Sequence, residues 1–293
     1  MIKYLQNKDI NYQKWDECIQ YSVNTRIYAY TWWLDSVCEH WDGLVYGDYE
    51  AVMPLPWKQK YLLKYIYQPP FTQQLGIFST NSSHFQKVQA YISAIPKVFV
   101  SIDTTFNDAN IIENNKYATT RRNQVLKLAT YYDEICHKYD KRLKEILKKY
   151  SNNYEFDIIY HLSIIDNVKF INKFYTSINL YLKNDDYARL TTLMTTLEAK
   201  NIYHNISYMK NNEIIGSQTY FVHNHRIYLS VGGCMNEYKQ YHIMHCMYDM
   251  IIKQFHDKSL LDFEGSEIEG VHFFNSRFGA LDTYYTHYRR GIW

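Results

Sequence analysis

The chain has 293 residues, of which 46% are hydrophobic and 21% are charged, and its formal net charge is +2. This size and composition predict one large or two ordinary ordered domains with a substantial core, and they exclude a largely disordered chain. The near-neutral charge excludes a surface that binds polyanions over its whole extent, whereas a local basic patch stays open.

Cysteine usage and hydropathy indicate a reduced, aqueous setting. The five cysteines are odd in number, scattered and without a CxxC pair, which argues against a disulfide framework or a structural zinc site. The first residues, MIKYLQNKDINYQKWDE, are charged and lack the apolar core of a signal peptide. No window approaches the roughly 18 uninterrupted apolar residues of a membrane span. We therefore expect a cytoplasmic protein with no membrane span.

The first third of the chain combines alternating and helical apolar patterns. A hairpin is indicated by Gly47-Asp48, and Pro69-Pro70 stops the strand that follows it. The expected elements are a strand over 1–6, helices over 12–22 and 28–38, a hairpin over 43–59, a strand over 61–71, a helix over 82–95 and a buried strand over 97–103.

Residues 107–150 differ in character, since they are polar, rich in Lys and Arg, and contain neither Pro nor Gly. We expect a strand up to Tyr117, then a basic connector, then a helix over about 138–150. Thr119 and Thr120 are residue types that cap helices. This stretch is the predicted domain junction.

The remainder returns to the first pattern. Tight turns are indicated at Asn211-Asn212 and Asn224-His225, and Asp166 is the expected cap of a helix. The expected elements are a strand over 156–163, helices over 166–182 and 185–200, three strands over 202–234, a helix over 238–258, a strand over 260–265, a helix over 269–279 and a last strand over 283–291.

Both halves share one order of elements: strand, two helices, three antiparallel strands, helix, strand. Such a repeat predicts an α/β chain with two tandem domains, each a mixed, mostly antiparallel sheet flanked by helices. The expected boundaries are 1–117 for the first domain, 118–151 for a basic linker and helix, and 152–293 for the second domain, which carries the expected site.

This order is the plan of the GNAT acyltransferase fold, and two local motifs resemble its FemABX-like branch. The basic segment TTRRNQVLKLA (119–129) is similar to a junction motif of that family, and LDFEGSEIEGVHFFNSRFGA (261–280) is similar to its closing motif. Gly270, Phe274, Phe278 and Gly279 are in register, with Asn275 where the family usually has a lysine. The motif match spans about 119–290.

The resemblance implies transfer of an acyl or aminoacyl group to a small-molecule or peptide amine. The donor would be an acyl-CoA co-substrate or an aminoacyl-tRNA, with no tightly bound cofactor. By resemblance, Ser230, Val231 and Gly232 would contact the donor's extended arm, and the loop with Lys239 and Gln240 its anionic end. That loop lacks the family's glycines, which favours an aminoacyl-tRNA, another donor or lost activity over conventional acetyl-CoA binding.

Asp262 and Glu264 are the candidate catalytic acids. Residues two apart on a strand share a face, and a carboxylate beside the acceptor amine is a suitable base. The alternatives are that they line the acceptor pocket, that one caps the next helix, or that one pairs with Arg277 or Arg289. The family's helix tyrosine is replaced by Phe273 and Phe274.

Arg121, Arg122 and Tyr285 are the candidate substrate contacts. Guanidinium groups suit bidentate binding of phosphate or carboxylate, although the arginines equally fit a solvated linker face. Tyr284 and Tyr285 are the tyrosines nearest in sequence to the expected cleft.

A metal site is not expected. His242, His245 and Cys246 share a helix face, but the sequence offers no motif that supplies a further ligand, and their apolar neighbours fit a packed helix. Two other functions stay open: a GNAT-derived binding protein without transfer chemistry, and a nucleic-acid binder, which the net charge disfavours.

Overall fold

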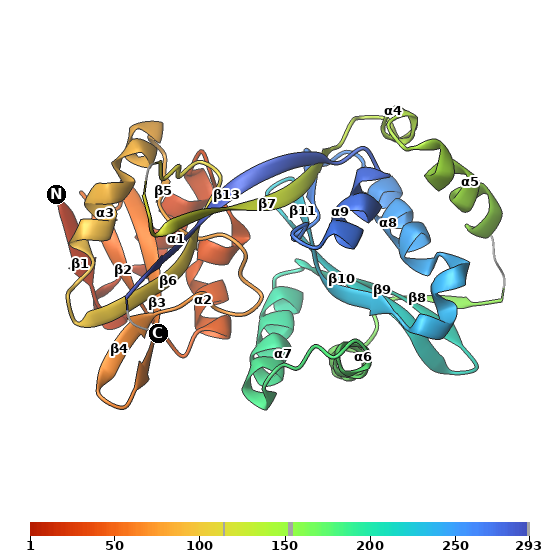
Figure 1. Cartoon of the computed structure of the whole chain (residues 1–293), viewed down its shortest axis with the longest axis horizontal. Helices are drawn as coiled ribbons and strands as arrows, with labels where there is room; N and C mark the ends of the chain where they lie inside the picture. The colour runs from red at the N-terminus through yellow and green to blue at the C-terminus, as the bar shows by residue number, and fades with distance from the viewer. Residues whose placement is uncertain (114, 152–154, 292–293) are drawn as a thin grey trace. The chain divides into compact units, whose positions relative to one another are not determined.

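A computed structural model describes residues 1–113, 115–151 and 155–291. The chain forms two compact units, one made of Met1–Arg122 with Tyr284–Trp293, and the other of Asn123–Thr283 (Figure 1). Each unit is an α/β layer structure, and the repeated element order confirms the predicted fold class. In the described part of the chain, no helix is long and apolar enough to cross a membrane.

The first unit is built on a mostly antiparallel sheet. Its strand order is β1-β2-β3-β4-β6-β13-β7, with β5 paired to β3 and only β4–β6 parallel among its recorded registers. The strands are β1 (Ile2–Leu5), β2 (His40–Tyr46), β3 (Ala51–Lys60), β4 (Leu63–Ile66), β5 (Phe78–Ser79), β6 (Phe99–Phe106), β7 (Ala118–Lys127) and β13 (Leu281–Arg290).

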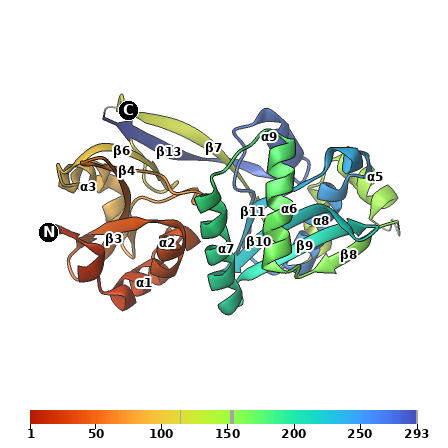
Figure 2. The ribbon, with the colours of Figure 1, turned by 90° about the horizontal axis from the view of Figure 1, so that it is seen from below.

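Helices cover both faces of this sheet, with α3 on one side and α1 and α2 on the other (Figures 1 and 2). The helices are α1 (Tyr12–Tyr21), α2 (Thr31–Val37) and α3 (Val88–Ala94). Tyr91 and Ile92 of α3 pack with Met53 and Ile102 of the sheet in one buried cluster. The turn at Gly47-Asp48 joins β2 to β3 as predicted.

The second unit repeats the plan. Its strand order is β7-β12-β11-β10-β9-β8, and β11–β12 is the parallel pair. Its elements are β8 (Asp157–Tyr160), β9 (Tyr203–Lys210), β10 (Glu213–His223), β11 (Arg226–Cys234), β12 (Leu260–Asp262), α4 (Tyr132–His137), α5 (Lys141–Tyr150), α6 (Ile164–Ser177), α7 (Asn184–Ala199), α8 (Ile243–Gln254) and α9 (Glu269–Ser276).

Here α5, α8 and α9 lie on one face of the sheet, and α6 and α7 on the other (Figures 1 and 2). Ile227 and Leu229 of β11 share a buried cluster with Met247 and Ile251 of α8. The predicted turns at Asn211-Asn212 and Asn224-His225 are present, and all four residues have positive φ, a conformation that Asn adopts more readily than most residues. The packing of β11 against α8 holds the end of β11 close to the start of α8.

The predicted basic connector is wrong, because residues 118–127 form strand β7. Thr119 and Thr120 therefore lie within a strand and cap no helix. The strand expected up to Tyr117 is also wrong, because β6 ends at Phe106. A loop begins at Asn107, whose side-chain amide donates to the Leu75 carbonyl oxygen.

Two helix starts differ from expectation. The helix expected over 138–150 is α5, and it begins after Asp140, whose carboxylate accepts from the Leu143 amide. The cap of α6 is Ser163 rather than Asp166, since the Ser163 hydroxyl accepts from the Asp166 amide at 3.1 Å. The expected domain boundaries at 117/118 and 151/152 describe where the element order repeats, and they stay a prediction. The chain packs into two units that divide after Arg122 and after Thr283.

Candidate functional site

The sheet of the second unit opens between β11 and β12. These strands pair in parallel over only three positions, from Arg226 opposite Leu260 to Tyr228 opposite Asp262. β12 ends there, whereas β11 continues to Cys234. Beyond Tyr228, this side of β11 therefore has no strand partner among the described strands.

A β-bulge lies at the start of this opening. Leu229 pairs with Tyr220 and Gly232 pairs with Gln218, so Ser230 and Val231 of β11 lie opposite a single residue of β10. A bulge breaks the ladder and redirects the strand. Two of the three residues expected to contact a donor therefore form the irregular part of the strand.

Glycines after the bulge are explained by packing. A Cβ added to Gly232 would lie 2.5 Å from the Ser217 carbonyl oxygen, and one added to Gly233 would lie 2.1 Å from the Phe174 ring. Both distances are below any normal contact. These glycines let β10 and α6 approach β11 closely, so their presence alone does not indicate a ligand.

A pocket of about 260 Å³ lies where β11 ends and α8 begins. Its walls come from the end of β11, the 3-10 turn Asn236–Tyr241, the first turn of α8, and α9. The lining residues are Cys234, Lys239, His242, Ile243, Met244, His245 and Phe274. Lys239 is one of these wall residues, and its role as a donor contact stays a prediction.

The lining of this pocket is mostly apolar, with the cationic Lys239 at its wall. Burial, followed by His242 and Arg277, lowers the pKa of His245 to about 4, so its imidazole is neutral at physiological pH. The His245 ring packs against Phe274 with centroids 4.5 Å apart. The first amides of α8 lack intrahelical acceptors, and the helix dipole adds positive potential there beside Lys239.

Asp262 is an anchor at the point where the strands separate. Its side chain is fully buried and accepts from Arg226 at 2.5 Å and from Asn123 at 2.8 Å. The same carboxylate accepts from the Glu264 amide at 3.1 Å. Pairing of Asp262 with Arg277 or Arg289 is therefore wrong, since Arg277 contacts Asp140 and Arg289 contacts Asp103.

Glu264 does not share a strand face with Asp262. Its φ is +50°, just beyond the end of β12, so the backbone turns after Asp262. The helix that follows, α9, begins after Ile268 without a side-chain cap. The structure thus separates the two carboxylates in environment: one is buried and paired with arginine, and the other is half-buried at the turn.

The three expected substrate contacts belong to the first unit. Arg121 and Arg122 are neighbours on strand β7, so their side chains leave opposite faces of the strand. Tyr285 lines a hollow of about 440 Å³ together with Asp108 and Glu113. A clamp made by both arginines on one face is not formed.

Sequence reasoning missed most of the pocket. Cys234, Met244, His245 and Phe274 sit on apolar stretches, where pocket walls and core share one pattern. The described residues hold no cluster of three or more His, Cys, Asp or Glu side chains placed to bind a metal. His242 and His245 pack edge to face, with ring centroids 5.2 Å apart.

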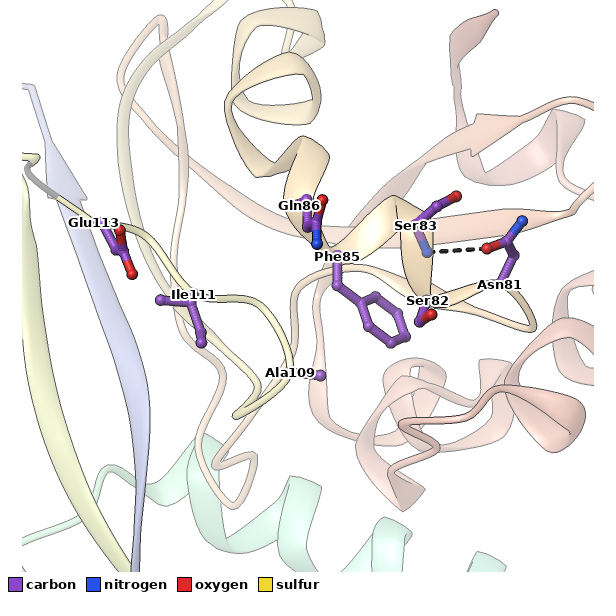
Figure 3. A pocket seen from close by; sticks show the side chains of 8 residues that line it. All are labelled: Asn81, Ser82, Ser83, Phe85, Gln86, Ala109, Ile111 and Glu113. Atoms are coloured by element: carbon purple, nitrogen blue, oxygen red, sulfur yellow. Dashed lines mark hydrogen bonds between the residues drawn. The ribbon is translucent and has the colours of Figure 1, made fainter.

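A larger hollow of about 770 Å³ lies in the first unit, between the 3-10 turn Ser82–Lys87 and the loop after β6 (Figure 3). Figure 3 shows Phe85 and Ile111 among polar side chains, with the Asn81 side chain accepting from the Ser83 amide at 2.9 Å. Glu113 is the titratable group in this lining. The opened strand pair, by contrast, combines a carboxylate, a cation and a helix start, so it is the better candidate site.

No protein-family model matches the chain, and no curated protein is similar to it in sequence. Solved structures are similar over nearly the whole chain. A FemX crystal structure has a TM-score of 0.70 at 9% identity and covers 98% of this chain and 97% of its own. A tandem GNAT protein from the clavulanic acid biosynthesis pathway has a TM-score of 0.54 at 9% identity, covering 98% of each chain.

A third similar structure is the C-terminal domain of a putative lysylphosphatidylglycerol synthetase from Agrobacterium fabrum, with a TM-score of 0.58 at 8% identity. It covers 96% of this chain and 92% of its own. The chain therefore has the tandem GNAT fold of the acyltransferases. Its likeness to FemX over both halves confirms the predicted resemblance to the FemABX-like branch of that fold.

Proposed function

We propose that the second unit transfers an acyl or aminoacyl group from a thioester or aminoacyl-tRNA to an amine, by direct attack. The opening between β11 and β12, with a pocket at its end, carries this proposal. Backbone groups of β11 without a strand partner suit the extended arm of a donor, because they would hydrogen-bond it as a neighbouring strand does. The chain and its fold neighbours share the overall fold.

The donor would lie along Ser230, Val231 and Gly232, with its phosphates toward Lys239, Gln240 and the first turn of α8. Lysine and helix-start amides are a common phosphate-binding combination. Both donor classes carry phosphate, so this placement applies to an acyl-CoA and to an aminoacyl-tRNA. The neutral His245 and the Phe274 ring would face the less polar part of the donor.

Glu264 is the proposed base on the acceptor side. The attacking amine forms the C–N bond as the C–S or C–O bond of the donor breaks, and the ammonium must lose a proton before it attacks. Asp262 is a positioning residue in this scheme, because it accepts from the Glu264 amide and is occupied by Arg226.

Replacing Lys239 with Gln is expected to raise the dissociation constant of the donor about tenfold, the cost of one charge-assisted hydrogen bond. Calorimetry with acetyl-CoA, longer acyl-CoAs and charged tRNA measures that constant, and mass spectrometry detects acylated small amines and peptides. Lys173→Gln, at an exposed position of α6 outside the pocket, serves as the matched control. Equal affinities for the two variants would contradict the donor placement.

A binding protein without transfer chemistry is the second candidate. Tyr241 packs edge to face on Phe156 at 5.0 Å, in the loop where the family has glycines, and Phe273 and Phe274 replace its helix tyrosine. Saturable donor binding with no acylated product from any donor would establish this alternative. Any acylated amine that depends on the protein would exclude it.

A further inference from the structure

The hairpin that joins β3 to β4 places apolar residues in solvent at its apex. Tyr61 is 87% exposed, Leu62 is 91% exposed and Leu63 is 56% exposed. Val98 and Val100, at the start of the neighbouring strand β6, are 55% and 48% exposed. Figure 1 shows the hairpin projecting from the sheet of its unit. Single exposed apolar residues are common, but an adjacent group at a projecting tip is not.

Neither backbone conformation nor burial explains the residue types at this apex. Tyr61 has a φ of +55°, in a region that Gly, Asn and Asp occupy far more readily than tyrosine. Lys60 pairs with Leu63, so Tyr61 and Leu62 form a two-residue turn, where glycine and asparagine would suit the backbone better. Tyr61 and Leu62 are thus large apolar residues that the turn leaves in solvent, and the positive φ disfavours Tyr61.

The strands that carry the apex, and the segment beside them, contain lysines and no acidic residues. The side chain of Lys60 lies over Tyr61, that of Lys64 lies 4.1 Å from the Trp57 ring centre, and that of Lys58 lies 4.7 Å from the Tyr67 ring centre. Lys97 precedes Val98 on the adjacent strand. Residues 57–67 and 96–102 contain no Asp or Glu. The tip is therefore apolar at its apex and carries lysines along its own strands, while Asp35 and Glu39 line a pocket with Trp57 at the base of the hairpin.

We propose that the β3–β4 hairpin docks this protein reversibly on anionic lipid bilayers. Tyr61, Leu62 and Leu63 would enter the interfacial region, while Lys58, Lys60 and Lys64 contact lipid phosphates. An apolar group backed by basic residues is the combination that binds peripheral proteins to anionic membranes. The proposal is independent of the transfer chemistry, since it rests on residues of the first unit alone.

Other occupants fit this tip less well. Single-stranded nucleic acid binds by stacking successive bases on open aromatic faces. Tyr61 is the one exposed ring among the three apex residues, since the nearby Trp57 ring is already stacked on His40 at 4.3 Å and flanked by Lys64. Leu62 and Leu63 have no face for stacking. A second copy of the chain would need an interface of roughly 1,200 Å² or more, which a two-residue convex tip does not supply.

Vesicle co-sedimentation tests the proposal with a variant that should fold well. Tyr61→Gly with Leu62→Asn gives the turn residues that a two-residue hairpin prefers, so its thermal stability should equal or exceed that of the parent. Its partition onto phosphatidylcholine vesicles containing about a third phosphatidylglycerol is expected to fall at least tenfold. Val23→Ser, which removes a 68% exposed aliphatic residue elsewhere in the first unit, should leave the partition unchanged.

The lysines are tested separately. Lys60→Gln with Lys64→Gln should lower the partition about 25-fold, or about fivefold per lysine. Lys3→Gln with Lys8→Gln lowers the net charge equally at exposed positions and should have a much smaller effect. Binding to pure phosphatidylcholine should be weak throughout.

Three results would overturn the proposal. They are no binding of the parent protein to anionic vesicles, equal loss in the tip and control variants, or a tip substitution that abolishes self-association or RNA binding instead of vesicle binding.

Discussion

Asp262→Asn is expected to lower the free energy of unfolding of the second unit by about 3–5 kcal/mol. The substitution removes the charge that Arg226 faces, and the Arg226 side chain is only 14% exposed. An amide still accepts one hydrogen bond, but the buried guanidinium keeps its charge without a counterion. Breaking one side of a buried ion pair is much more costly than losing a surface pair.

Urea unfolding followed by far-UV circular dichroism measures this change. All six tryptophans, at 15, 32, 33, 41, 57 and 293, lie outside residues 123–283, so tryptophan fluorescence reports the first unit separately. Asp157→Asn, at an exposed position on β8, is the matched control and should cost less than about 0.5 kcal/mol. Equal midpoints for the two variants would show that Asp262 is not the anchor.

The partner substitution separates charge pairing from packing. Asp262→Leu combined with Arg226→Met replaces the pair by apolar side chains and should recover much of the stability that either single change loses. Glu264→Gln should leave the unfolding midpoint near that of the parent while lowering the rate of transfer. That contrast distinguishes the positioning residue from the proposed base.

The repeated fold was predictable because its signals are local and recur in both halves. Turn residues at Gly47-Asp48 and Asn211-Asn212 mark hairpins, and their spacing defines the antiparallel strands on either side. The closing motif predicted the strand and helix that became β12 and α9. These features depend on residues close together in the chain.

Strand β7 escaped prediction because two of its four buried residues, Asn123 and Gln124, are polar. Asn123 and Gln124 are 1% and 0% exposed, yet their amides are used by Asp262 and Ser276, which lie more than a hundred positions away. No local pattern distinguishes such amides from those of a solvated linker. The strand exists because distant partners satisfy its side chains and because β12 pairs with it.

The expected donor contacts stay a prediction, and the structure adds where their residues lie in the fold. Donor contacts on β11 and Lys239 were expected by resemblance, and the structure places them beside the opened strand pair. The turn at Glu264 was not visible in the sequence, because a positive φ at glutamate has no compositional signal. The role of Arg226 was hidden for the same reason as that of Asn123: its partner is remote in sequence.

Acid is expected to destabilise the second unit through three partly buried histidines. Burial is the main cause that lowers the pKa values of His204, His223 and His245 from 6.5 to about 4. The folded state therefore favours the neutral imidazole, and this stability is fully present above the unfolded pKa of 6.5. It is lost as the pH falls through 6.5 toward 4, by about 3 kcal/mol for each ring.

His204→Phe isolates one of these contributions. The His204 ring is stacked on Tyr220 at 5.3 Å and packs edge to face on Phe255 at 5.4 Å, and phenylalanine retains both contacts without titrating. Stability at pH 7 should change little. Between pH 7 and pH 4, however, the variant should lose about 3 kcal/mol less than the parent, as measured by urea unfolding at each pH.

The exposed ring of His137 supplies the control for this comparison. His137 lies at the end of α4 with its side chain exposed, so His137→Gln removes no packed ring. If His204→Phe kept the pH dependence of the parent, the His204 ring would have to be protonated in the folded state, and its packing against Tyr220 and Phe255 would have to accommodate a charge that this apolar contact solvates poorly.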